Sequence, residues 1–345
     1  MNIDRYRISK SVSSFGMPLD DLVVQLQFLR AADYLVDVAA AKHGVQPSQM
    51  KKKAPLISAH VRIAEYYIDQ AMAGQSQVAF LPLYYAILNL LKIYVLLTRP
   101  VGDLQRNRWH GATYDVYGKN SHSLPTEQIT LRSGGAIPLF YEVITGRTIP
   151  DKTKVSLRSF CPFILDASAE WNLASGSTSG MGLISFKVEK NQNGLWIPQA
   201  KVTDVKGLPI TGIVSKIQSL KSFRKKRGED GIFVGNAVSG PVAFEEVRSQ
   251  TNPYLLYHQP GMSPMTPLSA QEIRWPEELP IVLLFFYMSS VSRYRPDFLD
   301  KLADSKYWPF LATVRTHGLT KFLFLLWSFV HKENFSISPQ TSSIF

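Results

Sequence analysis

Residues 78–117, VAFLPLYYAILNLLKIYVLLTRPVGDLQRNRWHGATYDVY, are the stretch around which the rest of the chain is interpreted. The run 78–97 is almost wholly apolar, with Pro82, Asn89 and Lys92 as its interruptions. A run of this length is too long for a buried strand and is rich in Leu and Ala, so it predicts a helix. Pro82 suits the first turn of that helix, where its missing N–H costs nothing.

The same run is long enough to cross a bilayer. Lys92 and Asn89 within it, and the lack of a companion span elsewhere in the sequence, favour a helix buried in a protein core. We therefore expect no membrane span. The start of the chain has no apolar segment typical of a signal peptide, and Cys161 is the single cysteine, so we expect a cytoplasmic protein without disulfides.

The densest polar chemistry follows directly, as Arg106-Asn107-Arg108-Trp109-His110-Gly111. Two guanidiniums and an imidazole so close together can donate hydrogen bonds to a phosphate. The alternative is a solvated turn with Trp109 packed beneath it. Residue spacing leaves both interpretations open.

The charge balance points to polyanionic partners. The 345 residues include 38 Lys and Arg against 27 Asp and Glu, a formal charge of +11. Such an excess favours nucleic acid as a partner, although an acidic protein surface also satisfies it. A second basic cluster, framed by glycines, is interpreted either as a solvated hairpin tip or as a contact to phosphates; it contains Lys221, Arg224, Lys225, Lys226 and Arg227.

The distribution of apolar and turn-forming residues along the chain predicts three regions and an α+β fold. Residues 1–117 read as an antiparallel helical bundle after an irregular arm, with helices at 17–43 and 56–73 and a lysine-rich loop between them. Residues 118–267 read as a mixed α/β insert with a small antiparallel sheet packed on the bundle. Residues 268–345 return to helices that pack back on the bundle, followed by a mobile tail from Asn334.

Short runs between turn residues predict the elements of the middle region. The expected strands lie at 128–133, 155–165, 183–191, 195–205, 231–236 and 241–247, and a helix is expected at 213–223. An Asn-Gly pair in KNQNGLW indicates a hairpin turn between the third and fourth of these strands.

Several catalytic classes lack their sequence signals. The chain has no P-loop, no dinucleotide-binding glycine fingerprint and no nucleophile elbow. Its seven histidines show no metal-ligand spacing, and Cys161 lies in an apolar run typical of a buried residue. We therefore expect neither a metal site nor a cofactor.

Two signatures resemble a known family. The run Tyr84-Tyr85-Ala86-Ile87-Leu88-Asn89-Leu90-Leu91-Lys92 followed by Trp109-His110-Gly111 resembles the bacterial YaaC-like family, mostly of unknown function. The C-terminal run Tyr287-Met288-Ser289-Ser290-Val291-Ser292-Arg293-Tyr294-Arg295-Pro296 is similar to the second signature of that family.

The first region also resembles HEPN helical domains, in which a Tyr-Tyr helix precedes an Arg-Asn-x-x-x-His motif. In ribonucleases of that group the resemblance implies metal-independent RNA cleavage by a dimer, with the His moving a proton and the Arg steadying the phosphate. Arg106 and Asn107 match the first positions and His110 the last. His110 follows Arg106 by four residues, one fewer than the pattern asks.

Three functions therefore compete. The first is a cytoplasmic nucleic-acid-binding protein acting in antiviral defence, with contacts from Arg106, Asn107, Arg108 and the second basic cluster. The second is a metal-independent ribonuclease with His110 and Arg106 as catalytic residues. The third is a non-catalytic subunit of a larger assembly, bound to a protein partner or to a second copy of itself.

Overall fold

The computed structural model describes residues 9–14, 18–74, 78–115, 123–176, 182–190, 193, 196–203, 224–228, 232–236, 263–265, 275–332 and 334–339. It contains two compact units. The helical unit comprises Tyr6–Ser175 and Glu278–Phe345, and the sheet unit comprises Met1–Arg5 and Gly176–Glu277. The division runs through the predicted insert, so residues 118–175 belong with the helices.

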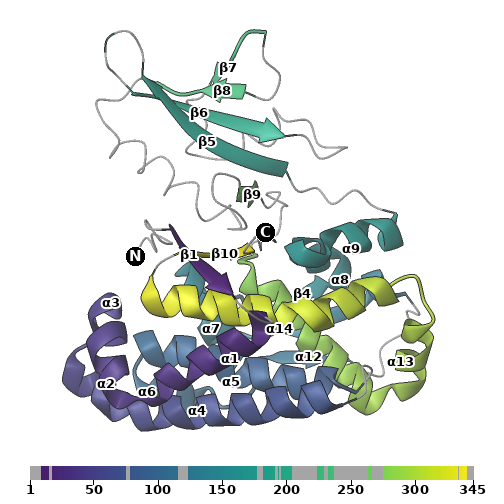
Figure 1. Cartoon of the computed structure of the whole chain (residues 1–345). Coiled ribbons are helices and arrows are strands. Elements are labelled where there is room, and N and C mark those ends of the chain that lie inside the picture. The colour runs from purple at the N-terminus through teal and green to yellow at the C-terminus, as the bar shows by residue number, and fades with distance from the viewer. Residues whose placement is uncertain are drawn as a thin grey trace, which may run out of the picture. The chain divides into compact units, whose positions relative to one another are not determined.

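Helix α5 (Phe80–Thr98) is the centre of the helical unit (Figure 1). It packs against α4 (Pro47–Ala73), α7 (Ala136–Thr145), α12 (Glu278–Tyr294) and α14 (Trp308–His331). By length and composition α5 would cross a membrane, but 78% of its apolar window is buried in the protein, as in a core helix. A helix that is apolar all round needs neighbours on every side, and α5 has them.

Helix α4 begins much earlier than predicted. The expected loop before residue 56 is wrong, because the helix starts at Pro47 and continues through Pro55. Met50, Ala54, Ile57 and Val61 recur at helical spacing and are all buried, and this stripe outweighs the backbone hydrogen bond that Pro55 cannot donate. Lys53, expected on a solvated loop, is buried, and burial lowers its pKa.

The single helix expected at 17–43 is also wrong. The structure has α1 (Pro18–Leu26), a 3-10 turn, α2 (Ala32–Tyr34), a π-helical turn and α3 (Ala41–His43). Leu29 and Leu35 would face about 120° apart on one continuous helix. The extended backbone of Ala31 interrupts the helix and changes the direction in which the following side chains point. Both leucines are therefore fully buried.

The C-terminal helices confirm the prediction for this region. Helices α12, α13 (Pro296–Ala303) and α14 follow one another, and α12 and α14 pack on α5. Within the irregular arm and the mobile tail expected at the two ends, residues 9–14 and 334–339 form strands instead. Strand β1 (Ser9–Ser14) pairs in parallel with β10 (Asn334–Pro339), so backbone hydrogen bonds occupy both segments.

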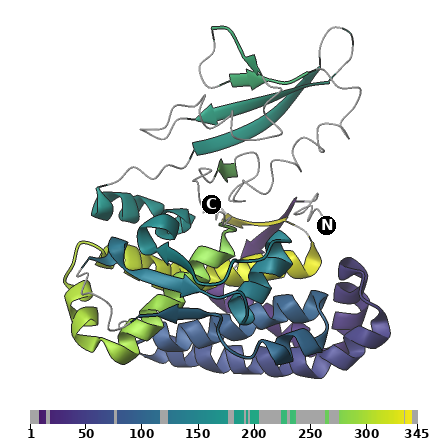
Figure 2. The same cartoon turned by 180° about the vertical axis from the view of Figure 1, so that it is seen from behind.

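A three-stranded antiparallel sheet lies within the helical unit (Figure 2). Its strands, in the order β2-β3-β4, are Ala112–Tyr114, Gln128–Leu131 and Thr153–Ser156. The strand expected at 155–165 is wrong beyond Ser156, where α8 (Leu157–Phe160) and further turns lead to α9 (Ser168–Ser175). Leu157, Phe160 and Phe163 are all buried, and a short run that is apolar throughout does not distinguish strand from helix.

The sheet unit contains a five-stranded antiparallel sheet in the order β7-β8-β6-β5-β9. Its strands are Arg224–Lys225, Ile232–Val234, Trp196–Thr203, Gly182–Lys190 and Ser263–Met265, in that order. Strands β5 and β6 pair from Lys190 with Trp196, which confirms the predicted hairpin. The helix expected at 213–223 and the strand expected at 241–247 lie outside the described residues. Together the two units confirm the α+β class.

Candidate functional site

One face of α5 carries the polar residues that interrupt its apolar run. Tyr85, Asn89 and Lys92 are spaced by four and three residues, which places them in one stripe. The Asn89 amide nitrogen donates to the Tyr85 carbonyl at 2.8 Å, so its oxygen faces the Nδ1 of His60 on α4, also at 2.8 Å. This arrangement requires the proton of a neutral His60 on Nδ1 and leaves Nε2 as an acceptor.

The loop that carries His110 is fixed by the N-terminus of α7. The backbone N–H groups of Gly135, Ala136 and Ile137 donate to the Asn107 side chain, the Trp109 carbonyl and the His110 carbonyl at 2.8, 2.8 and 3.0 Å. These bonds satisfy the donors that a helix leaves free at its start.

Two glycines allow this close approach. Gly111 and Gly135 both have positive φ, at 79° and 113°. A Cβ on Gly111 would overlap Pro138, and a Cβ on Gly135 would overlap the backbone of Gly111. The turn formed by Trp109, His110 and Gly111 therefore depends on these glycines, and it directs the His110 side chain towards α5.

His110 meets the buried Tyr84 of α5. The Tyr84 hydroxyl hydrogen-bonds the His110 Nδ1, and the two rings stack with centroids 5.5 Å apart. Phe286 of α12 packs against both rings, at 5.6 and 6.2 Å. Burial raises the pKa of Tyr84 well above its ordinary value, so its hydroxyl stays protonated.

The charges around His110 are cationic. Burial lowers the pKa of His110, and the positive charges of Arg293 on α12 and Lys92 on α5 lower it further. Burial also lowers the pKa of Lys92 and of His60. Within the part of the chain that the structure describes, no carboxylate pairs with Lys92 or Arg293. The half-buried Lys92 and the exposed Arg293, with no counter-ion among the described residues, form a local site of positive potential.

Tyrosine rings lead from this site to the surface. The ring centroid of Tyr85 lies 5.7 Å from that of Tyr84 and 5.2 Å from that of Tyr67 on α4, on which it stacks. Tyr67 in turn contacts the exposed Tyr66. The Arg293 guanidinium donates to the Tyr85 hydroxyl at 3.5 Å and to the Ser289 carbonyl at 3.2 Å. We call this set of residues the α5–α12 site; it comprises His60, Tyr67, Tyr84, Tyr85, Asn89, Lys92, His110 and Arg293.

Arg295, two residues further along, has a different environment. Its guanidinium donates to the Tyr114 hydroxyl at 2.6 Å and pairs with Glu127 at 3.4 Å, with the two charged side chains only 14% and 6% exposed. Tyr114 in turn donates to Glu127 at 2.5 Å. Burial, followed by the bond to Glu127, raises the pKa of Tyr114 to about 12. This triad ties the end of α12 to the three-stranded sheet.

The structure separates the residues of the predicted Arg-Asn-Arg-His cluster. Arg106 ends α6 (Val101–Arg106) and pairs with Asp103 at 2.5 Å, with its own side chain 73% exposed. Asn107 is occupied in the turn, and the Arg108 Nε donates to the Gln105 carbonyl at 3.0 Å on the surface. His110 is the member of the cluster that enters the α5–α12 site.

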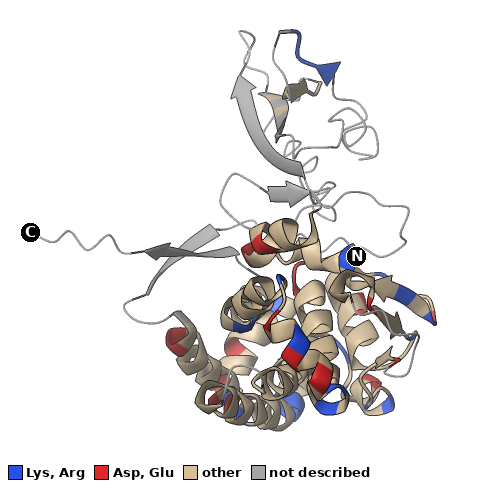
Figure 3. Ribbon diagram, turned by 90° about the vertical axis from the view of Figure 1, so that its right-hand side faces the viewer, with Lys and Arg blue, Asp and Glu red and all other residues tan. Residues whose placement is uncertain are grey.

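The second basic cluster lies in the sheet unit. Arg224 and Lys225 form β7, whose two residues are both basic and exposed (Figure 3). Lys226 donates its backbone N–H to Ile232, and Arg227 is exposed in the turn that follows. Lys221 lies outside the described residues.

Sequence reasoning did not assign His60, Lys92 or Arg293 to a site. Polar residues at helical spacing inside an apolar run were the available signal for Asn89 and Lys92. Among the described residues, no group of three or more His, Cys, Asp or Glu side chains is arranged to hold a metal ion.

Comparison with known proteins gives one match. A family model described as YaaC-like Protein matches residues 27–330. No curated protein and no solved structure matches the chain. The matched range contains the α5–α12 site and both signatures that form it, while the resemblance to HEPN domains stays a prediction.

Proposed function

The chain belongs to the YaaC-like family, and from the site that its two signatures build together we propose that it binds nucleic acid. The proposal places a backbone phosphate against Lys92, His110 and Arg293. The observation that supports it is the gathering of these three groups in one site, with Arg293 exposed at its edge, without a carboxylate partner among the described residues. Arg and Lys side chains and hydroxyl groups are common phosphate contacts.

The rings beside the site favour a single strand over a duplex. Tyr66, Tyr67 and Tyr85 form a series of contacts from the surface to the site, with Arg293 beside Tyr85. Unpaired bases stack on such rings, whereas bases within a duplex have no free face. The formal charge of +11 supplies long-range attraction for the strand.

Binding of a labelled single-stranded RNA, measured by fluorescence anisotropy over a range of salt concentrations, tests this function. Variants Lys92→Gln and Arg293→Gln should each weaken binding and reduce the slope of log K against log salt by about 0.7. Arg147→Gln removes the same charge from an exposed residue outside the site and serves as the matched control. Equal affinities for all four proteins would contradict the proposal.

The second basic cluster is tested in the same assay. Removal of the charges of Arg224, Lys225, Lys226 and Arg227 should flatten the salt dependence if this cluster also contacts phosphates. Duplex RNA and single-stranded DNA of equal length complete the comparison. Failure of wild type to bind any of them at low salt would favour a subunit of a protein assembly instead.

A ribonuclease is the second candidate, and the bond between Tyr84 and His110 favours it. If the His110 Nδ1 carries the proton and donates to Tyr84, the Nε2 is unprotonated and can accept a proton from a 2′-hydroxyl. The lowered pKa of His110 keeps the imidazole neutral near pH 7. Arg293 and Lys92 would offset the charge that develops on the phosphate.

Cleavage of structured and unstructured RNA in EDTA tests this second function. Wild type should cut, His110→Ala should not, and Arg293→Gln should be impaired more than Arg106→Ala if Arg293 is the phosphate contact. If wild type and His110→Ala both leave the RNA intact, His110 is a binding residue and not a catalytic one. Antiviral defence, a cytoplasmic location and a homodimer remain part of the proposal and require assays in cells and of mass in solution.

A further inference from the structure

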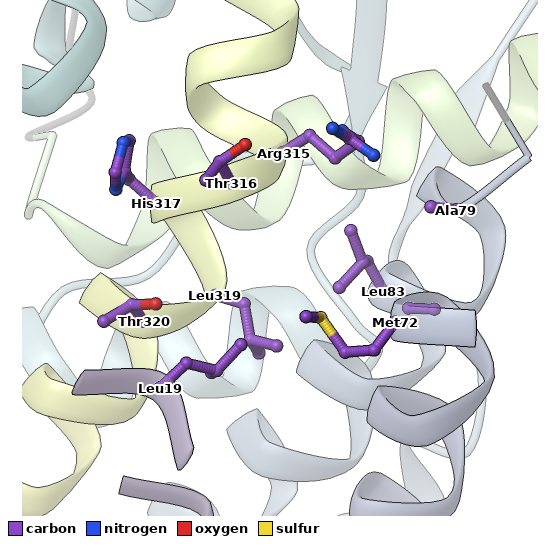
Figure 4. A pocket seen from close by; sticks show the side chains of 10 residues that line it. Leu19, Met72, Ala79, Leu83, Arg315, Thr316, His317, Leu319 and Thr320 are labelled. Carbon is purple, nitrogen blue, oxygen red and sulfur yellow. The ribbon is translucent and has the colours of Figure 1, made fainter. Parts of the chain in front are cut away.

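A cavity of about 310 Å³ opens in the helical unit, and its lining residues are different from those of the α5–α12 site. Helices α1, α4, α5 and α14 supply its walls. Figure 4 shows Leu19, Met72, Leu83 and Leu319 gathered on one side of the Arg315 guanidinium, while His317 lies apart from them. The cavity thus has apolar walls and one strongly cationic end.

Arg315 is the unusual member of this lining. Its Nε is buried and has no hydrogen-bond partner among the described residues. Two other partly covered guanidiniums do pair with carboxylates: Arg99 with Glu142 at 2.7 Å and Arg295 with Glu127 at 3.4 Å. A buried donor of a charged group is costly when it is left without an acceptor, so Arg315 favours a ligand that brings an anionic oxygen to this end of the cavity.

We propose that this cavity binds a small carboxylic acid with an apolar tail. The carboxylate accepts hydrogen bonds from Arg315, whose planar donors match two carboxylate oxygens. The tail packs against Leu19, Leu83 and Leu319, and Met72, which is 58% exposed, forms the rim.

Charge and size select this ligand class. Among the described lining residues, Arg315 is the one side chain with a full positive charge, and a single carboxylate balances it, whereas a doubly charged phosphate would leave net charge in an apolar cavity. A heavy atom in a liquid occupies about 30 Å³, judged from water, so the cavity holds about ten. Octanoate has that size and is the probe we choose.

Isothermal titration calorimetry of the full chain with octanoate tests the proposal. We expect saturable binding of octanoate to wild type, and much weaker binding of butyrate, octanol and octylamine, which lack the tail or the anion. Arg315→Gln should weaken octanoate binding at least tenfold. Met72→Trp, at the exposed rim, should also weaken it by narrowing the entrance, and Arg147→Gln should bind like wild type.

Thermal unfolding by circular dichroism establishes that each variant is folded, and Arg315→Lys supplies a second variant that keeps the charge but loses the paired donors. Lack of octanoate binding to wild type, equal binding of octanol, or full binding to Arg315→Gln would each overturn the proposal. The result is independent of nucleic-acid binding, because the residues that it tests lie outside the α5–α12 site.

Discussion

Two arginines near the end of the same short signature have opposite electrostatic environments. Arg295 is only 14% exposed, is paired with Glu127 and is bonded to Tyr114, whereas Arg293 is exposed and bonded to Tyr85 and Ser289. Arg293 lies in the last turn of α12 and Arg295 directly follows the helix, and both meet a tyrosine. The difference lies in the carboxylate: the Arg295 triad is electrically complete and holds the fold together, while the α5–α12 site has an excess of positive charge that a ligand can neutralise.

Loss of the carboxylate in the triad should give the largest effect. Glu127→Gln leaves the largely covered Arg295 without its counter-ion, so it should cost a substantial part of the about 3–5 kcal/mol of unfolding free energy that removal of one partner costs in a fully buried pair. Arg293→Gln should change that free energy by less than about 0.5 kcal/mol, because the side chain is exposed. Urea unfolding followed by circular dichroism measures both, and similar losses would erase the distinction.

The pH dependence should separate the site from the core. Burial lowers the pKa of His43, which packs on Phe329 at 4.8 Å, from 6.5 to about 4, and it lowers that of His110 too. Both groups hold fewer protons in the folded state, so they make the unfolding free energy fall as pH drops below 6.5. For His43 this loss ends near pH 4.

An anion in the site should alter only one of these titrations. A bound phosphate favours protonated His110, so an oligonucleotide should raise the pKa of His110 and leave that of His43 unchanged. Binding should therefore tighten as pH falls from 7 towards 5. Imidazole proton shifts in NMR spectra, recorded with and without the oligonucleotide, report both residues, and an unmoved His110 would remove it from the ligand site.

The hydroxyl of Tyr84 should matter less for stability. Tyr84→Phe removes its hydrogen bond to His110 but keeps the buried ring, which should cost about 1 kcal/mol. RNA binding or cleavage should fall further than this, because the imidazole loses its orienting partner. Tyr94→Phe, on the same helix but outside the α5–α12 site, is the control, and equal functional losses would point to the helix and not to His110.

Arg106 should give the smallest effect. Its ion pair with Asp103 is exposed, and such pairs contribute about 0–1 kcal/mol. Arg106→Gln should leave the unfolding free energy nearly unchanged and weaken RNA binding less than Arg293→Gln does. If Arg106→Gln weakened RNA binding more than Arg293→Gln, Arg106 would be the phosphate contact, as the sequence motif suggested.

The sequence was informative where one pattern filled a whole element. The run 78–97 predicts α5 because nothing but a helix buries so many successive apolar residues, and α12 and α14 follow from similar runs. The sequence pattern misled where two signals conflict. The lysine run 51–53 suggested a solvated loop, while the apolar stripe from Met50 to Val61 is typical of a helix, and burial of the stripe prevailed.

The site was less predictable, because adjacency in sequence says little about where side chains point. Arg106 and Arg108 are neighbours of His110 in the chain, yet their hydrogen bonds are made to Asp103 and Gln105. Lys92 and Arg293 are far apart in sequence, yet both lower the pKa of His110, because α12 packs on α5. Only the tertiary packing of these two helices brings the charges together.

The packing of α12 on α5 also has a consequence for biosynthesis. Residues 176–277 are made between the two halves of the helical unit, so α5 leaves the ribosome well before α12 and α14 exist to cover it. During that interval a long apolar helix lacks two of its neighbours, and such surfaces promote aggregation and chaperone binding. Completion of the α5–α12 site therefore waits until the sheet unit has been made, and a nascent chain that stops before Arg293 lacks one of the two cations of the site.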